Sequence, residues 1–499
     1  MKSQTNHQFN LDPITSGIAV ALVAIVLWVL GALSLGLSEP LRFILILPMQ
    51  AILHYLIGYY CIRFGQVIGY SNPIYLFWVA HSLHYLQIYG ITNLIPICQP
   101  SKVGFANLGF TIVPDQLPAA NLSVLLSYIC SAYVFTMLLG RLSEKQRRLD
   151  IRELLISPMV LFFGILAMLI QLAASIRLGP LYNSTLGQQL LDSGRLYDTV
   201  SLPEKWFYSG TFIFTYVPIL VLALYAILKP ASQRLKYIIL IIPFAIIAIF
   251  SFSILRQRSY AMLSTVSALL PFTFIKSIKV FIIPFIPIIT ILVYFFVTSL
   301  RGDTIDKLGT DLDFSSFFGG ANQDTILLGD TAFNDASYNR AGLDSISVLI
   351  DFQEKGILHS KFGFQFISEF LAGFPEFIRL IVPDNLLTNT VEEVGIAVGQ
   401  SGIDMPRNPY MAFVHDFHWL IAPFLYALIG FTFLYYLTLL IIKITNSFPR
   451  ILGVLYIPYL SIIFLASSFS SYSVFLKVIF PWFILLMLVG FLTKNYRSL

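Results

Sequence analysis

Residues 281–314 read FIIPFIPIITILVYFFVTSL followed by RGDTIDKLGTDLDF. The first part carries no charge and is long enough to cross the hydrocarbon core of a bilayer as a helix. The second part opens a polar segment, and residues 301–407 hold sixteen of the chain's 26 acidic residues and seven of its 31 basic ones. Because apolar segments flank it on both sides, we expect one large loop of a membrane protein, with the chemistry of the protein located in it.

The composition supports a multi-span membrane protein. Hydrophobic residues make up 57% of the 499 residues, charged residues make up 11%, and the mean hydropathy is +0.79. A soluble domain carries about 25% charged residues. The net charge of +5 comes without a basic patch, so no nucleic-acid partner is predicted. Cys61, Cys98 and Cys130 lie far apart, which gives neither a disulfide framework nor a metal pattern.

Apolar windows of about 20 residues predict an all-α, polytopic fold with about twelve transmembrane helices. Residues 1–300 form a bundle of about nine spans, residues 301–411 form the large loop, and residues 412–499 form about three closing spans. The predicted spans are 15–37, 42–63, 73–94, 119–141, 154–176, 206–228, 237–255, 259–275, 279–300, 412–442, 451–468 and 474–493.

Basic residues predict the orientation. With twelve spans, the clusters at residues 141–152, 229–236, 276–279 and 443–450 and at the C-terminal end all fall on one side, which the positive-inside rule makes cytoplasmic. Both termini are then cytoplasmic and the large loop faces outward. The same count places Arg256 and Arg258 on the outer side, against this rule. Either the number of spans before them is wrong by one, or their outer position serves a function.

Two stretches of the loop are predicted to be helical. Residues 338–350 place Leu343, Ile346 and Leu349 on one face. Residues 362–381 mix aromatic, aliphatic and charged residues. We expect a pair of amphipathic helices at the membrane surface. The alternative is a scaffold that packs on the outer ends of the bundle.

Six arginines are predicted to lie on the outer side near the loop. Guanidinium groups bind phosphate oxygens through paired donors and keep their charge when partly buried. They therefore suit a lipid-linked pyrophosphate, or alternatively they pair with loop carboxylates or lipid head groups. These arginines are Arg256, Arg258, Arg301, Arg340, Arg379 and Arg407.

His415, Asp416 and His418 stand at the outer mouth of the tenth predicted span. On a helix, the two histidines share a face. A carboxylate or an imidazole at this position can take a proton from a sugar hydroxyl. The alternatives are hydrogen bonds to a neighbouring helix or a metal pair, and we predict no metal site because further ligands are not clustered with them.

His81, His84 and Gln87 form a polar stripe along the third predicted span. Polar groups in hydrocarbon face the bundle interior or a cavity, so the stripe indicates helix–helix hydrogen bonds or a transport path. The sequence has no GxxxxGK[ST], GxSxG or HExxH motif. This argues against an ATP-driven pump, a hydrolase elbow and a zinc protease.

The layout, together with several short segments, resembles the Wzy-type polymerases of bacterial O-antigen and capsule repeat units. The usual proline–arginine–tryptophan stretch of that family is replaced after Pro383 by Asp384 and Asn385. The segments that carry the resemblance are 256–263, Asn339 with Arg340, 381–383, Asn408 with Pro409, and His415 and Asp416 followed by Gly430.

The resemblance implies a GT-C-like glycosyltransferase of the bacterial inner membrane, with the large loop in the periplasm. Its substrates would be polyprenyl-pyrophosphate-linked oligosaccharides, with no cofactor. Its partners would be membrane lipids, a chain-length regulator and a flippase. The alternatives are an O-antigen ligase, another polyprenyl-dependent transferase, a transporter or flippase of lipid-linked saccharide, and a structural membrane component of a larger synthesis complex.

The resemblance also suggests roles for individual residues. Asp416, His415 and Arg340 are the candidates for catalysis. The candidates for binding pyrophosphate or glycan are Arg256, Arg258, Arg301, Arg407 and His418.

Overall fold

The computed structural model describes residues 12–35, 40–94, 116–147, 149–150, 158–182, 216–254, 342–372, 390, 393–394 and 409–447. These residues form helices and turns and contain no strand, which confirms the all-α class for them. The helices are α1 (Pro13–Leu35), α2 (Pro40–Ile68), α3 (Pro73–Leu94), α4 (Leu117–Gly140), α5 (Glu144–Arg147), α7 (Pro158–Tyr182), α10 (Val217–Leu228), α11 (Ala231–Ile254), α17 (Gly342–Glu354), α18 (Phe364–Ala372), α21 (Pro409–Asp416), α22 (Ala422–Leu425), the π-helix η9 (Tyr426–Phe431) and α23 (Thr432–Ser447).

Proline sets the start of many of these helices. α1, α2, α3, α7 and α21 each begin with a proline, and α4, α10 and α22 carry one within their first two residues. Proline has a backbone φ that suits a helix. It also has no backbone N–H group, and an N–H group in the first turn would have no intrahelical acceptor. The starts of these helices are therefore encoded locally.

Three helices are long and apolar enough to cross a membrane. They are Leu117–Gly140, Val160–Arg177 and Ala422–Ile444, the last of which runs through α22, η9 and α23. The helices α1, α2, α3, α10 and α11 overlap five further predicted spans. The remaining four, at 259–275, 279–300, 451–468 and 474–493, lie outside the described residues. The count of twelve therefore stays a prediction.

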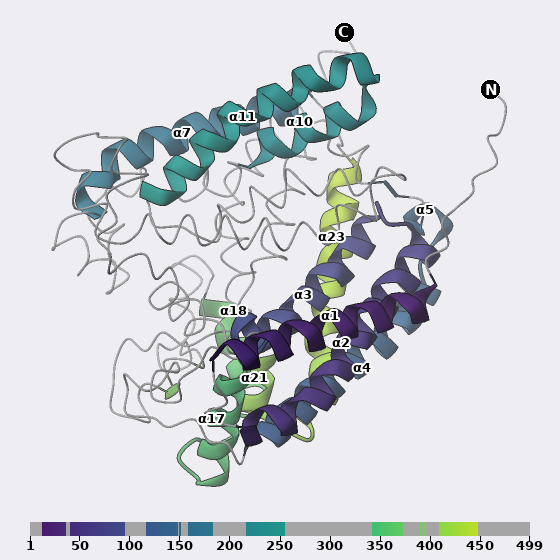
Figure 1. Ribbon diagram of the computed structural model, residues 1–499, viewed down its shortest axis with the longest axis vertical. Helices are drawn as coiled ribbons and strands as arrows, with labels where there is room; N and C mark the ends of the chain where they lie inside the picture. The colour runs from purple at the N-terminus through teal and green to yellow at the C-terminus, as the bar shows by residue number, and fades with distance from the viewer. Residues whose placement is uncertain are drawn as a thin grey trace. The chain divides into compact units, whose positions relative to one another are not determined.

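The described helices belong to two compact units, each of which draws on more than one of the three predicted regions. The first unit contains α1 to α5, α17, α21, α22, η9 and the start of α23. Its N-terminal helices lie side by side (Figure 1). At the α1–α2 contact, a Cβ atom on Gly58 would lie 3.0 Å from the Cα atom of Gly17. Small residues allow this close approach of two membrane helices.

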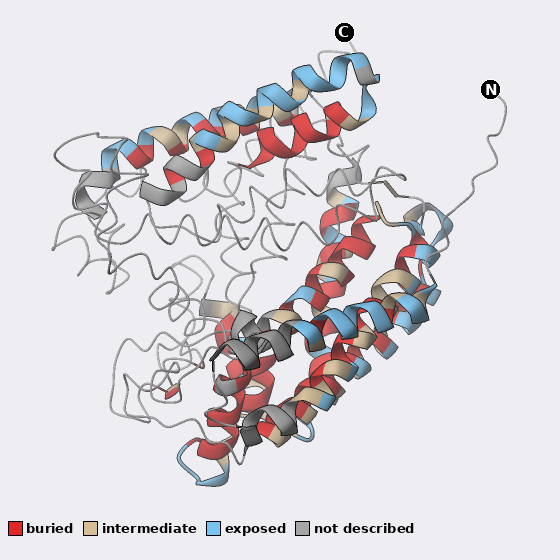
Figure 2. Ribbon diagram, viewed as in Figure 1, coloured by how far each residue is buried: buried red, intermediate tan, exposed pale blue. Residues whose placement is uncertain are grey.

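Along α4, three serines face the interior of the first unit, and large apolar side chains lie on the outer face. Ser123, Ser127 and Ser131 are buried, whereas Tyr133 and Met137 are 67% and 51% exposed. Figure 2 shows the buried parts of the helices in red and the exposed parts in pale blue. Polar side chains of a membrane helix turn toward the protein because hydrocarbon offers them no hydrogen-bond partner. The distribution therefore agrees with a membrane location for α4.

The second unit contains α7, α10 and α11, which pack on one another. A Cβ atom on Gly164 would meet Val217 Cγ1 at 2.7 Å, so glycine is needed where α7 meets α10. Ser175 Oγ donates to Gln171 O at 2.8 Å and to Ser251 O at 3.3 Å, which links α7 to α11. Most of α10 is buried, while α11 exposes isoleucine and leucine side chains.

The π-helix η9 interrupts the spanning helix at Tyr426–Phe431. Gly430 within it is buried, and a Cβ atom there would lie 2.8 Å from Phe413 Cε2. The ring of Phe413 also packs against the ring of Tyr426, with centroids 5.4 Å apart. The wide turn and the glycine thus let α21 approach the spanning helix closely.

Candidate functional site

The tenth predicted span, 412–442, is wrong as a single helix. Helix α21 ends at Asp416, a turn follows, and α22 begins at Ala422. The turn is closed by the carbonyl oxygen of His418, which accepts hydrogen bonds from the backbone N–H groups of Ile421 at 2.8 Å and Ala422 at 2.9 Å. Pro423 then supplies the first turn of α22. The continuous apolar run of the sequence conceals this break.

All four final carbonyl groups of α21 have donors. Phe413 O accepts from the N–H of Phe417 at 2.9 Å, and Asp416 O accepts from the N–H of Phe362 at 3.1 Å. Gln353 Nε2, at the end of α17, donates to Val414 O at 2.8 Å and to His415 O at 2.9 Å. Because a helix leaves its last carbonyls without intrahelical donors, these partners stabilise the abrupt end of α21.

The side chain of Asp416 caps the start of α18. Its two carboxylate oxygens accept hydrogen bonds from the backbone N–H groups of Gln365 at 2.9 Å and Phe366 at 2.8 Å. These N–H groups belong to the first turn of a helix, where a carboxylate is the favoured acceptor. The end of α21 and the start of α18 thus cap each other.

Asp416 is fully buried. Burial raises the pKa of its carboxyl group, and the backbone donors and Lys361 oppose that rise. A raised pKa suits a group that exchanges a proton. The burial and the two hydrogen bonds, however, fix the position of the carboxylate in this conformation.

The two predicted histidines of the site lie in different environments. His415 is buried within α21, whereas His418 is exposed in the turn and its Nδ1 accepts from the N–H of Leu420 at 3.3 Å. The prediction that they share one helical face is wrong because the helix ends between them. Of these two histidines, His418 is therefore the one whose imidazole is accessible to solvent.

Every residue of α17 from Ser345 to Phe352 is buried, which corrects the prediction of an amphipathic helix at the membrane surface. Leu343, Ile346 and Leu349 are buried as predicted, but Ser345 and Ser347 are buried as well. The helix packs against α3, α4 and α21. The alternative prediction, a loop that packs on the bundle, describes α17 better.

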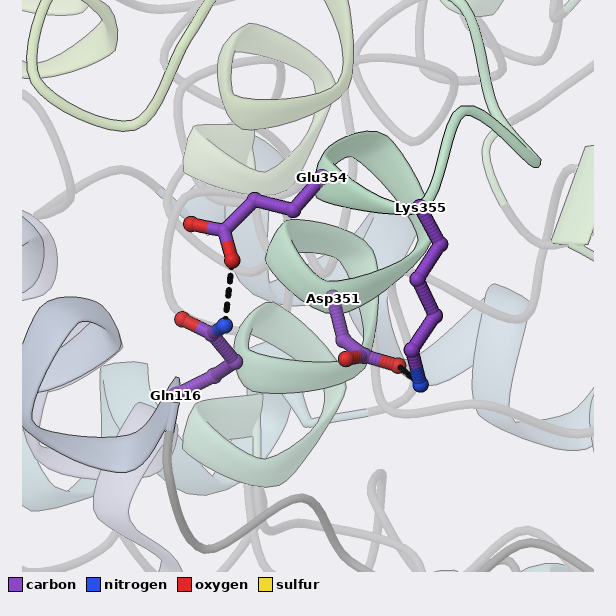
Figure 3. Close-up of polar contacts among 4 residues, drawn as sticks. All are labelled: Gln116, Asp351, Glu354 and Lys355. Carbon is purple, nitrogen blue, oxygen red and sulfur yellow. Dashed lines mark hydrogen bonds and ion pairs between the residues drawn. The ribbon is translucent and has the colours of Figure 1, made fainter.

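Charged residues gather at the C-terminal end of α17 (Figure 3). Glu354 Oε2 accepts a hydrogen bond from Gln116 Nε2, just before α4, at 2.5 Å. Lys355 Nζ forms an ion pair with Asp351 Oδ2 at 2.6 Å. The Glu354–Gln116 contact joins the late loop to a residue more than two hundred positions earlier in the chain.

A seam of hydroxyl groups joins α4 to its neighbours. The hydroxyls of Ser123 and Tyr410 form a short hydrogen bond, and Ser123 Oγ also donates to Trp419 O at 2.7 Å. One turn further along α4, Ser127 Oγ lies 2.6 Å from the hydroxyl oxygen of Tyr85. Sequence reasoning missed this seam and Gln353. For the seam, a signal was available in the sequence: Ser123, Ser127 and Ser131 are spaced four residues apart in an apolar span and so lie on one helical face.

His81 and His84 are buried in α3, as predicted for residues that face the bundle interior. The imidazole of His81 stacks on Tyr426 at 6.1 Å and lies 4.6 Å from the ring of Phe431, both in η9. Among the described residues, His81 Nε2 has no hydrogen-bond partner. Only the backbone of Gln87 is described.

The structure leaves the predicted arginines untested. Within the residues that it covers, no group of three His, Cys, Asp or Glu side chains could hold a metal ion. The predicted arginines that lie outside these residues are Arg256, Arg258, Arg301, Arg340, Arg379 and Arg407.

The described site is thus a buried junction of α17, α18 and α21, with His418 exposed beside it. Its polar contacts join α17 and the start of α18 to α21. Comparison of the chain with protein-family models, curated proteins and solved structures found no match.

Proposed function

We propose that this protein is a GT-C-like glycosyltransferase that joins polyprenyl-pyrophosphate-linked oligosaccharide repeat units into O-antigen or a related surface polysaccharide. It would act at the outer face of the bacterial inner membrane, with both termini in the cytoplasm and the large loop in the periplasm. A chain-length regulator and a flippase would be its protein partners.

One structural observation supports this proposal most directly. The polar late segment is built into the helix bundle through Gln353, Asp416 and the buried helix α17. Binding and catalytic residues commonly lie on loops that a rigid scaffold positions. A loop anchored in this way can hold polar groups at a membrane surface, where a lipid-linked sugar presents its head group.

In the proposed reaction, the bond between the anomeric carbon of the growing glycan and its lipid pyrophosphate breaks. A hydroxyl oxygen of the next repeat unit forms the new glycosidic bond, and the lipid pyrophosphate leaves. We assign the hydroxyl proton to the exposed imidazole of His418 and a positioning role to His415 and Asp416. The charge on the departing pyrophosphate would be stabilised by five of the six predicted outer arginines. These are Arg256, Arg258, Arg301, Arg340 and Arg407.

The test is an extension assay with the purified protein in proteoliposomes and a lipid-linked repeat unit. We expect a ladder of longer glycans from the wild type and its loss in Arg340→Ala. The matched control is Arg63→Ala, which removes an exposed arginine of α2 whose Nη1 donates to Tyr59. A wild type that makes no ladder from its proper substrate would refute the proposal.

The same assay separates a polymerase from a ligase or another polyprenyl-dependent transferase. A polymerase adds repeat units successively, so the product lengths differ by one unit. A ligase transfers the glycan once to a different acceptor. A single product that requires an added acceptor would therefore favour the ligase.

A transporter or flippase of lipid-linked saccharide is the second candidate. The buried histidines His81 and His84 favour it, because transport paths in membranes use polar groups of the bundle interior. Flipping of a fluorescent lipid-linked saccharide, measured in the same proteoliposomes, tests this candidate. Loss of flipping in His81→Phe, with no extension ladder in the wild type, would favour the transporter.

A further inference from the structure

Helix α18 has polar side chains inside and apolar side chains outside. Gln365, Ser368 and Glu369 are buried, at 0%, 5% and 4% exposed, whereas Phe364 and Ile367 are 59% and 50% exposed. A surface helix of a soluble protein shows the opposite pattern. The reversed pattern is that of a helix with apolar surroundings, because polar groups in a membrane turn toward protein partners.

The buried polar side of α18 is hydrogen-bonded. At its start, the Asp416 carboxylate accepts from the N–H groups of Gln365 and Phe366. Further along, Glu369 Oε1 accepts from Thr390 Oγ1 at 2.6 Å and from the N–H of Thr390 at 3.2 Å. These contacts fix which side of the helix faces the protein, so the apolar side is held outward.

Phe362, just before α18, is held outward as well. It is 80% exposed and has a φ of 53°, in the left-handed region that bulky residues rarely adopt. The bond from its N–H to Asp416 O and the φ of 99° at Gly363 maintain this turn. An outlier of this kind persists only where the surrounding structure fixes it, which points to a use for the exposed ring.

Helix α18 also contacts the spanning helix, through Phe366. The ring of Phe366 packs against that of Phe433 in α23, with centroids 6.0 Å apart. Ile429 and Tyr436, about one turn to either side of Phe433, are 43% and 51% exposed. Ala422–Ile444 is long and apolar enough to span a membrane, so an exposed apolar surface on it suits contact with lipid.

We infer that Phe362, Phe364 and Ile367, here named the apolar edge, insert into the bilayer beside the spanning helix. The partner of this edge is the acyl-chain region below the lipid head groups. Phenylalanine and aliphatic side chains on the apolar face of an interfacial helix are buried at the boundary between head groups and acyl chains. The apolar edge thus anchors the polar late loop in the membrane, a role that does not depend on the reaction proposed above.

The test uses single cysteines at Phe362 and Ile367 in a chain whose native cysteines, Cys61, Cys98 and Cys130, are replaced by alanine. Each is labelled with the fluorophore NBD and placed in phosphatidylcholine–phosphatidylglycerol nanodiscs, with or without brominated acyl chains. The control is His359→Cys, at an exposed polar position in the same connection. We expect brominated lipid to lower the emission at 362 and 367 at least twofold, and aqueous iodide to quench mainly at 359.

Two outcomes would overturn the inference. Iodide quenching at 362 and 367 equal to that at 359 would place the edge in water. Protection of both positions from iodide and from brominated lipid would mean that another protein surface covers them. A cysteine at 362 can relax the left-handed turn and so change the position of the label. Ile367→Cys lies within α18, so its quenching tests the position of the apolar edge independently of that turn. A thermal midpoint equal to that of the cysteine-free chain shows that each variant is folded.

Discussion

Replacing Asp416 by alanine is expected to destabilise the junction between α21 and α18. The substitution removes the acceptors of the Gln365 and Phe366 N–H groups at the start of α18. Gln365 is fully buried, so water cannot readily replace the carboxylate. Asparagine at 416 keeps one oxygen but turns an NH2 group toward the other N–H donor.

The expected magnitude follows from these two bonds. Loss of a helix cap costs about 0.5–2 kcal/mol, and a buried N–H group left without an acceptor costs about 1–3 kcal/mol. Removal of a buried carboxylate offsets part of this cost. We therefore expect Asp416→Ala to lower the free energy of unfolding by about 2–3 kcal/mol and Asp416→Asn by about half as much.

The measurement is thermal and denaturant unfolding of the purified protein in detergent, followed by tryptophan fluorescence. Glu354→Ala is the control, because it removes an exposed carboxylate with a single hydrogen bond to Gln116. We expect a loss of less than about 1 kcal/mol from that control. Equal unfolding midpoints for the wild type and Asp416→Ala would show that the carboxylate does not hold α18.

The pH dependence of stability gives a second reading of Asp416. Its pKa is raised in the folded state, so the folded protein retains the proton over a pH range in which the unfolded chain has lost it. The stabilisation from this proton is present below the unfolded pKa and is lost as the pH rises through the folded pKa. We expect Asp416→Asn to flatten the fall in stability of the wild type across that range. An unchanged slope would mean that another group causes it.

Three further substitutions test the packing. Gln353→Leu removes the donor to Val414 O and His415 O and should cost about 1–3 kcal/mol, read from the unfolding midpoint; an unchanged midpoint would mean that the end of α21 is stabilised by other contacts. Gly430→Ala places a Cβ atom 2.8 Å from Phe413 and should lower the free energy of unfolding by about 1–3 kcal/mol in the same assay. The control is Gly140→Ala, where a Cβ atom meets nothing within 4 Å, and it should leave the unfolding midpoint unchanged. Gly58→Leu should separate α1 from α2 and lower the yield of folded protein in size-exclusion chromatography, and a normal elution profile would contradict the close crossing at Gly17.

Local signals in the sequence predicted most of the described helices. The apolar windows at 15–37, 42–63, 73–94 and 119–141 match α1 to α4 to within a few residues, except that α2 continues to Ile68. Uninterrupted apolar length predicts a membrane helix well because hydrocarbon forces the backbone to bond internally. The loop helix predicted at 338–350 occurs as α17, displaced toward its C-terminal end.

The candidate site was less predictable because long-range pairs create it. Nothing near His418 in the sequence reveals that α21 ends at Asp416. The donors that satisfy that end are Gln353 and Phe362, more than fifty residues earlier. Periodicity likewise marked one apolar face of α17 but gave no sign that Ser345 and Ser347 on the other face are also buried.

The π-helix η9 has a consequence for the phase of the spanning helix. A π turn holds one residue more than an α turn, so each residue after Phe431 is rotated by about 100° from the direction that an unbroken α-helix would give it. Deleting one residue within η9 would restore the α register and rotate all of α23 relative to α22. Phe433 would then lose its alignment with Phe366 while the hydrophobicity of the span stayed the same. The length of this segment, and not its composition alone, therefore sets which side chains α23 presents to the late loop.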